Sequence, residues 1–165
     1  MLTTRAEILA HLTSLGIETE TFDHPPVFTV EESQQHTAHL PGAHCKNLFL
    51  KDKKDRLWLV TCGDEQRVDL NRLSKALGAA RFSFGRSELL REVLGVEPGS
   101  VTPLAIVNDS DGRVTHVLDA RLAAQGIVNC HPLRNDATTA IRGADLLRFI
   151  RSTGHEPVLL DLDAL

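Results

Sequence analysis

The chain is poor in cysteine, in net positive charge and in long apolar runs. Its three cysteines, Cys45, Cys62 and Cys130, are too few and too odd in number for a disulfide framework. The formal net charge of -4 argues against the global basic field of a non-specific nucleic-acid binder. No stretch reaches the roughly 18 uninterrupted apolar residues of a membrane span, and the N-terminus carries no apolar signal core. We therefore expect a cytoplasmic protein with reduced thiols, no membrane partner, and RNA contacts confined to a local patch.

Motifs for nucleotides and metals are also missing. Neither Gly-x-x-x-x-Gly-Lys-Ser/Thr nor Gly-x-Gly-x-x-Gly occurs, which removes the usual phosphate cradles. His24, His36, His39, His44 and Cys45 invite a zinc hypothesis, but structural zinc usually shows tight Cys or His pairs on both sides of a loop. We therefore predict neither a cofactor nor a metal site.

The order of predicted elements indicates one mixed domain spanning residues 1–165. Its 42% hydrophobic content is enough for one core. Helices are expected where capping residues precede apolar residues at helical spacing, and strands where β-rich runs lie between turn residues. The expected helices are 5–15, 30–40, 70–77, 87–94 and 144–153, and the expected strands are 17–23, 45–51, 56–62, 81–84, 104–108, 114–119, 127–131, 137–141 and 157–162.

Hairpins interspersed with single helices favour an α+β, or mixed α/β, class. We expect a mixed, mostly antiparallel sheet surrounded by helices. One hairpin is predicted over 45–62 and a second over 104–119, each around a charged or Asp/Gly-rich turn. A serine cap at Ser87 is expected to begin the helix that Gly95 ends.

Three polar elements are predicted at the ends of strands, where open sheets usually build ligand sites. They are the Lys46-Asn47 pair, the Gly99-Ser100-Val101-Thr102-Pro103 loop, and His131-Pro132. We interpret them as the walls of one pocket.

The Lys46-Asn47 pair has a functional and a structural interpretation. Lys46 is either a fixed cation for a phosphate or developing oxyanion, or a lysine whose stem packs on apolar surface while its amine stays in water. Asn47 faces the opposite side of a regular strand, so an amide that ties down the loop at Pro41-Gly42 is an equally reasonable role.

The glycine loop and His131 also have a functional and a structural interpretation each. Glycine permits unusual angles and proline forces an extended predecessor, so the loop can present carbonyl oxygens inward, although such loops are commonly ordinary turns. His131 is a base or a packing residue of the wall. A Cys130-His131 nucleophilic pair is disfavoured, because neighbouring strand residues face opposite ways.

Four blocks in this order resemble the YbaK-type aminoacyl-tRNA deacylase family, and more narrowly its free-standing prolyl-tRNA editing branch. The resemblance covers nearly the whole chain. The blocks are His24-Pro25-Pro26, residues 41–52, residues 95–103 and residues 131–139.

The resemblance implies a YbaK-like fold and a hydrolase that cleaves the ester between an amino acid and the terminal adenosine of tRNA. It implies that Lys46 is the catalytic or substrate-anchoring cation and that the loop from Gly99 to Pro103 holds the amino group and water through its backbone. His131 and Asn47 match pocket residues. The terminal ribose hydroxyl helps to activate water in this family. The resulting candidate residues are Lys46, Gly99 and His131 for catalysis, and Asn47, Ser100, Val101, Thr102 and Pro103 for binding.

Selectivity has a physical rationale in this scheme. A synthetase pocket for proline rejects the smaller alanine weakly, since a missing methylene is worth only about 1–3 kcal/mol, and a second, smaller sieve repairs the error. The expected substrate is alanyl-tRNA for proline, with walls that include Val101, His131, Thr21 and Phe22.

Other functions stay open at this point. A deacylase for cysteine, serine or threonine esters, a zinc-dependent hydrolase, and a non-catalytic module that binds tRNA ends or a synthetase are the alternatives. The expected partners are the acceptor end of aminoacyl-tRNA and prolyl-tRNA synthetase. Candidate tRNA contacts are Lys51, Lys53, Lys54, Arg81 and Arg86.

Overall fold

Eight strands form one mixed sheet in the computed structural model, which describes residues 1–165. The spatial order is β1-β7-β6-β2-β3-β5-β8, and β4 pairs with β2. Four of the seven pairings are antiparallel and three are parallel, so the mixed α/β class is confirmed. The strands are β1 Thr19–Asp23, β2 Ala43–Asp52, β3 Leu57–Gly63, β4 Phe82–Phe84, β5 Val114–Asp119, β6 Val128–Cys130, β7 Ala137–Ile141 and β8 Val158–Leu160.

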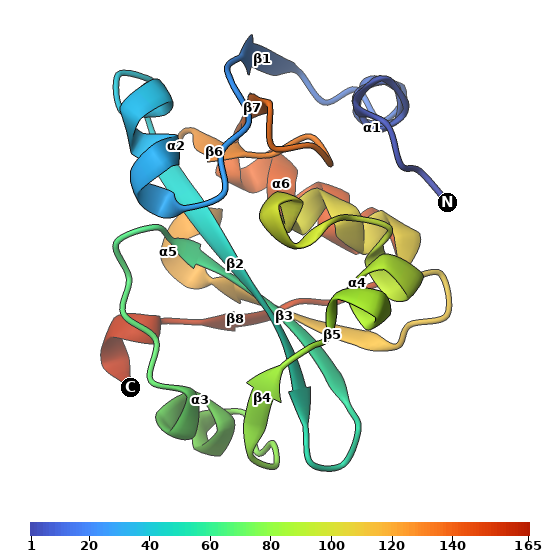
Figure 1. Ribbon diagram of the computed structural model, residues 1–165, viewed down its shortest axis with the longest axis vertical. Coiled ribbons are helices and arrows are strands. Elements are labelled where there is room, and N and C mark those ends of the chain that lie inside the picture. Colours follow the sequence, from blue (N-terminus) through green and yellow to red (C-terminus); the bar gives the residue numbers. More distant parts are fainter.

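Helices pack around this sheet (Figure 1). Thr4 and Glu7 form the predicted capping box of the first helix, and the Thr29 side chain accepts a hydrogen bond from the Glu32 amide at the start of the second. No helix combines the length and apolar character needed to cross a bilayer. The helices are α1 Arg5–Ser14, α2 Val30–Thr37, α3 Leu70–Ala76, α4 Ser87–Leu94, α5 Ala120–Ala123 and α6 Gly143–Ser152, with 3-10 turns at Pro98–Ser100, Pro103–Asn108 and Leu162–Ala164.

The long strand β2 contributes to two apolar clusters, one on each face of the sheet. Phe49 belongs to the larger cluster, which includes residues of α1, α4 and α6. Leu48 and Leu50 pack in the smaller cluster, which includes Leu73 of α3. Because side chains alternate along a strand, Asn47 lies on the side of Phe49 and Lys46 on the side of Leu50.

Two predictions about local structure are wrong. Residues 104–108 are not a strand, because Pro103 begins a 3-10 turn in which the Thr102 hydroxyl accepts from the Leu104 amide at 3.3 Å. The expected hairpin over 104–119 is therefore absent, and β5 instead pairs in parallel with β3 and β8. The helix α4 begins at Ser87 as predicted, but Arg86 occupies its N-cap position and makes no side-chain cap.

The predicted first hairpin is confirmed and is stabilised at its turn by a buried carboxylate. Asp52 accepts hydrogen bonds from the amides of Lys54 and Arg56 at 2.9 and 3.0 Å, and from the Trp58 indole at 3.3 Å. Burial alone would raise the pKa of Asp52, but these hydrogen bonds to the ionised form lower it below its ordinary value. The turn thus fixes the register of β2 against β3.

Candidate functional site

A cavity of about 170 Å³ lies between the start of α2, the first half of β2, the end of β6 and the loop after α4. Figure 1 shows α2 beside the N-terminal part of β2, which forms one side of this space. Six of its lining residues are hydrophobic, and the remainder are polar or charged residues, one glycine and one proline. The lining residues are Val27, Phe28, Thr29, Val30, Ser33, His44, Cys45, Lys46, Asn47, Asp64, Pro98, Gly99, Val101, Asn129, Cys130, His131 and Thr138.

The cavity brings together the three elements predicted from the sequence. Lys46 and Asn47 line it from β2, Gly99 and Val101 from the loop, and His131 from the end of β6. The other candidate residues lie outside this lining, and their expected role in binding stays a prediction: these are Ser100, Thr102, Pro103, Thr21 and Phe22.

The positions of the excluded residues have simple causes. Ser100 and Thr102 are buried inside the loop, where Thr102 caps the following 3-10 turn. Thr21 lies on β1 and shares a 2.8 Å hydrogen bond with Thr139 of β7, so it stabilises strand pairing. These residues support the walls of the cavity without facing it.

Gly42 explains how the start of β2 reaches β6. Its φ of +100° is in the left-handed region, and a Cβ atom there would lie 2.6 Å from the Ile127 carbonyl oxygen. The next amide, of Ala43, donates to that carbonyl at 2.9 Å. Only glycine permits this close approach, which places Ala43 and His44 of β2 beside Val128 and Asn129 of β6.

Asn47 connects the central strand to the glycine loop. Its amide nitrogen donates to the Val101 carbonyl at 3.2 Å, and its amide oxygen accepts from the Thr61 hydroxyl at 2.7 Å. Asn47 therefore ties down a loop, as one sequence interpretation expected, but the loop is the one at Gly99 to Pro103 and not the one at Pro41-Gly42. The Val101 carbonyl is already occupied by this contact.

A buried histidine extends this network. The Thr61 hydroxyl lies 2.9 Å from His116 Nε2 and already donates its one proton to Asn47, so His116 must donate from Nε2. Its Nδ1 atom has no partner and carries the lone pair of a neutral ring. Burial, with a smaller contribution from His155, lowers the pKa of His116 from 6.5 to about 3.

His131 is also held in one neutral form. Its Nδ1 lies 2.9 Å from the Ala137 carbonyl, which can only accept, so the ring proton is on Nδ1 and the Nε2 lone pair remains available. Burial is the main cause that lowers the pKa of His131 below its usual value, despite the opposing contact with Ala137. The site therefore offers a neutral imidazole acceptor at neutral pH.

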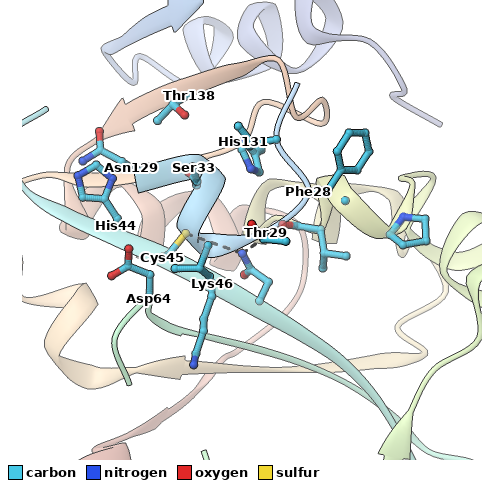
Figure 2. A pocket seen from close by; sticks show the side chains of 17 residues that line it. Phe28, Thr29, Ser33, His44, Cys45, Lys46, Asp64, Asn129, His131 and Thr138 are labelled. Atoms are coloured by element: carbon cyan, nitrogen blue, oxygen red, sulfur yellow. Dashed lines mark hydrogen bonds between the residues drawn. The ribbon is translucent and has the colours of Figure 1, made fainter. Parts of the chain in front are cut away.

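Lys46 is half-buried. Figure 2 shows its side chain extending away from His131 and Thr138. The one lysine in a salt bridge is Lys51, with Asp55 at 3.0 Å, so the Lys46 amine is unpaired. An amine enclosed against the Gly99 loop is thus not the conformation seen, because alternation along β2 sends Lys46 to the face opposite Asn47.

Two cysteines of the lining are neighbours that the sequence did not connect. The parallel pairing of β2 with β6 places Cys45 beside Cys130, and both thiols are free. The hydrogen bond with Cys130 and burial raise the pKa of Cys45 well above its ordinary value of 9.0. At neutral pH this thiol is protonated and is a poor nucleophile.

Other lining residues were missed because no local signal marks them. Val27 to Val30 line the site from the segment leading into α2, where the sequence showed only a helix cap. Asp64 follows β3 and is bonded to Gln34 of α2 at 3.3 Å. Asn129 donates to the Pro41 and Ala43 carbonyls, and its buried Oδ1 has no partner. Each position depends on pairing between distant segments.

The neutral state of His116 gives a pH prediction for stability. The unfolded chain binds a proton at this residue below about pH 6.5 and the folded chain does so only near pH 3, so stability is lost as pH falls through that window. A His116→Gln variant retains a donor for Thr61 but has no imidazole to protonate. Between pH 6.5 and pH 5 we expect its free energy of unfolding to fall by about 2 kcal/mol less than that of the parent. Urea unfolding at the two pH values measures this difference.

The control for this prediction is the His39→Gln variant. Because His39 is exposed, the stability of this variant should show the parental pH dependence. An equal loss of stability in the His116→Gln variant and the parent would contradict the neutral, buried assignment.

Comparison with known proteins places this geometry in a family. Residues 24–149 match the model of the aminoacyl-tRNA editing domain. The chain is 47% identical over 161 residues to a prolyl-tRNA synthetase associated domain-containing protein 1 of Danio rerio, covering 96% of this chain and 88% of the relative. It is 32% identical over 149 residues to the prolyl-tRNA editing protein ProX of Acetoanaerobium sticklandii, covering 90% and 91%.

Solved structures agree on the fold. One, described as a proposed trans-editing enzyme for prolyl-tRNA synthetase, superposes with a TM-score of 0.71 at 20% identity, covering 97% of this chain and 98% of that one. At this identity the likeness establishes the fold alone. The family match covers the pocket residues from Val27 to Thr138, and the resemblance found in the sequence is confirmed. The chain belongs to the aminoacyl-tRNA editing domain family.

Proposed function

We propose that this protein is a trans-editing deacylase that hydrolyses the ester of mischarged aminoacyl-tRNA, with alanyl-tRNA for proline as its preferred substrate. The observation that carries the proposal is one cavity, in a chain of the editing family, that is lined by Gly99, by the neutral His131 and by part of the Lys46 side chain. The prolyl-tRNA editing relative supports the choice of tRNA. The small cavity supports a small amino acid.

The chemistry needs no covalent nucleophile. Ester hydrolysis develops negative charge on the carbonyl oxygen, and a cation or hydrogen-bond donor placed there lowers the barrier. The raised pKa of Cys45 makes its thiol a poor nucleophile, and the proposal takes water as the attacking group. The free Nε2 of His131 accepts a hydrogen bond from the substrate or from this water, and the terminal ribose hydroxyl assists as the family resemblance implies.

Lys46 supplies the positive charge by changing the conformation of its side chain. It lines the cavity with part of its stem, its amine has no competing salt bridge, and four rotatable bonds separate that amine from the strand. The negatively charged RNA end attracts the amine toward the site. Substrate binding thus brings the Lys46 ammonium group into the site, from which it points away in the free protein.

Loop rigidity explains how the site can act as a sieve. The Val101 carbonyl is held by Asn47, which is itself held by Thr61, so the loop cannot retreat without breaking buried hydrogen bonds. A ring as large as proline then meets fixed walls at Val101 and Gly99, whereas alanine does not.

A panel of charged tRNAs tests the proposed substrate. Purified protein at catalytic amounts should discharge alanyl-tRNA for proline faster than cysteinyl, seryl or threonyl esters and leave prolyl-tRNA intact. The rates of ester loss measure the preference. Discharge only at stoichiometric amounts would favour a non-catalytic binding module, and a faster rate on another small ester would reassign the substrate.

Removal of the Lys46 amine tests the catalytic assignment. We expect Lys46→Ala to lower the deacylation rate by about 100-fold or more, the scale of losing one oxyanion stabiliser, without change in thermal stability. Lys75→Ala, on the exposed face of α3, is the matched control and should keep the parental rate. Unchanged turnover of Lys46→Ala would remove this residue from the mechanism.

The basic side chains near the β2–β3 turn are proposed to contact the tRNA backbone. Lys51, Lys53 and Arg86 border one surface groove, five residues or about 17 Å along β2 from Lys46 at its nearest point. Acidic neighbours, including Asp55 bonded to Lys51, limit the local charge. This mixture predicts loose, salt-sensitive binding.

Charge reversal tests this surface. Lys53→Glu combined with Arg86→Glu should weaken tRNA binding and flatten its dependence on salt, by roughly 0.7–0.9 in logarithmic slope per lost phosphate contact. Lys75→Glu combined with Arg67→Glu, both at exposed positions outside this groove, changes the net charge by the same amount and is the control. Affinity that is the same in the double variant and this control would refute the surface, which the family resemblance alone does not locate.

A further inference from the structure

One exposed aromatic ring stands at the edge of the cavity. The Phe28 residue is 71% exposed, and among the large hydrophobic residues exposed on this protein it is the one that lines the cavity. Figure 2 shows its ring at the edge of the group of lining side chains, on the side away from Lys46 and Asp64. The ring thus contributes little to the core and is available to a ligand that enters the site.

The backbone on both sides of Phe28 is fixed. Val27 is 2% exposed, its amide donates to the Asn135 carbonyl at 3.1 Å, and its carbonyl accepts from the Asn135 side chain at 2.7 Å. Thr29 is the N-cap of α2. Only the side-chain torsions of Phe28 remain free, so the ring is presented with little conformational entropy left to lose on binding.

Gly99 provides the surface against which this ring lies. A Cβ atom at Gly99 would be 3.0 Å from Cδ1 and 3.5 Å from Cε1 of Phe28. The ring therefore contacts the backbone of the glycine loop and leaves most of its remaining surface open to solvent. This arrangement links the open aromatic surface directly to the loop that walls the cavity.

The surroundings favour a nucleobase as the occupant. Thr29, which follows Phe28 in the chain, is polar, and the ring is a single aromatic group beside a small cavity, not part of a broad apolar face. A base offers a flat π-surface that matches one ring and stays polar at its edges.

We propose that Phe28 is the stacking platform for the terminal base of the RNA substrate, which positions the ester on the attached ribose over the cavity. The proposal rests on the proposed function, because it assigns the nucleotide subsite of the same site. Stacking stabilises the bound substrate and the transition state equally. Its loss therefore raises KM and leaves kcat unchanged. Phe28 is thus a binding and positioning residue.

The first test compares kinetics of variants on the charged tRNA. We expect Phe28→Ala to raise KM by roughly 5- to 150-fold, the fold-change that one lost base–aromatic stack represents, with kcat close to parental. Phe28→Tyr should restore KM, since it keeps the ring. Leu159→Ala is the control, because Leu159 on β8 is 43% exposed and lines neither the cavity nor the groove beside Lys51.

The second test needs no ester. A short oligoribonucleotide with the tRNA 3′ sequence and 2-aminopurine in place of its terminal adenine should lose fluorescence on binding the parent and Phe28→Tyr, and keep it with Phe28→Ala. Thermal unfolding of the variants checks that the fold is intact. Unchanged KM and unchanged quenching in Phe28→Ala would overturn the proposal, as would a fall in kcat alone.

The two proposals fail separately. If the parent discharges no ester but quenches the oligonucleotide through Phe28, the stacking subsite stands and the deacylase function falls. The Phe28→Ala variant could instead deacylate tRNA and quench 2-aminopurine fluorescence as the parent does, but no longer bind prolyl-tRNA synthetase. In that case the ring contacts a protein and the stacking proposal is refuted.

Discussion

The hydrogen bond from the Asn47 amide to the Val101 carbonyl is the contact on which the site depends. It joins the central strand β2 to the loop that walls the cavity, across 54 positions of the chain. Because Thr61 and His116 continue the chain of hydrogen bonds into β3 and β5, the loop is anchored to three neighbouring strands of the sheet. A polar network of this kind is rigid only when every donor finds an acceptor. The neutral, singly protonated state of His116 meets that condition, with only its Nδ1 lone pair unused.

Because side chains alternate along β2, the residues that this strand contributes to the site lie on two faces of the sheet. Asn47 and Cys45 face the cavity side and give it fixed structure, whereas Lys46 extends from the other side with a free amine. In the proposed function, the fixed wall limits the size of the amino acid, and the Lys46 amine moves toward the negatively charged substrate.

The elements with local signals could be predicted from the sequence. The capping box at Thr4, the turn at Asp52 and the breaks at Gly16 and Gly95 place helices and strands within a few residues of where they lie. The loop at residues 104–108 could not, because its apolar run has the composition of a strand. Its 3-10 form follows from Pro103 and from burial between α4 and α6, which no local pattern records.

The sequence by itself determined the mixed class of the fold, most of its helices and strands, and three polar elements that line the cavity. It also carried the family resemblance, because short motifs preserve the residues that chemistry requires. Only the tertiary structure decided which face Lys46 occupies, that Asn47 holds Val101, and that Phe28 and the two cysteines border the site. These outcomes depend on strand register and on contacts between segments far apart in the chain, and a one-residue change in register would reverse every one of those faces.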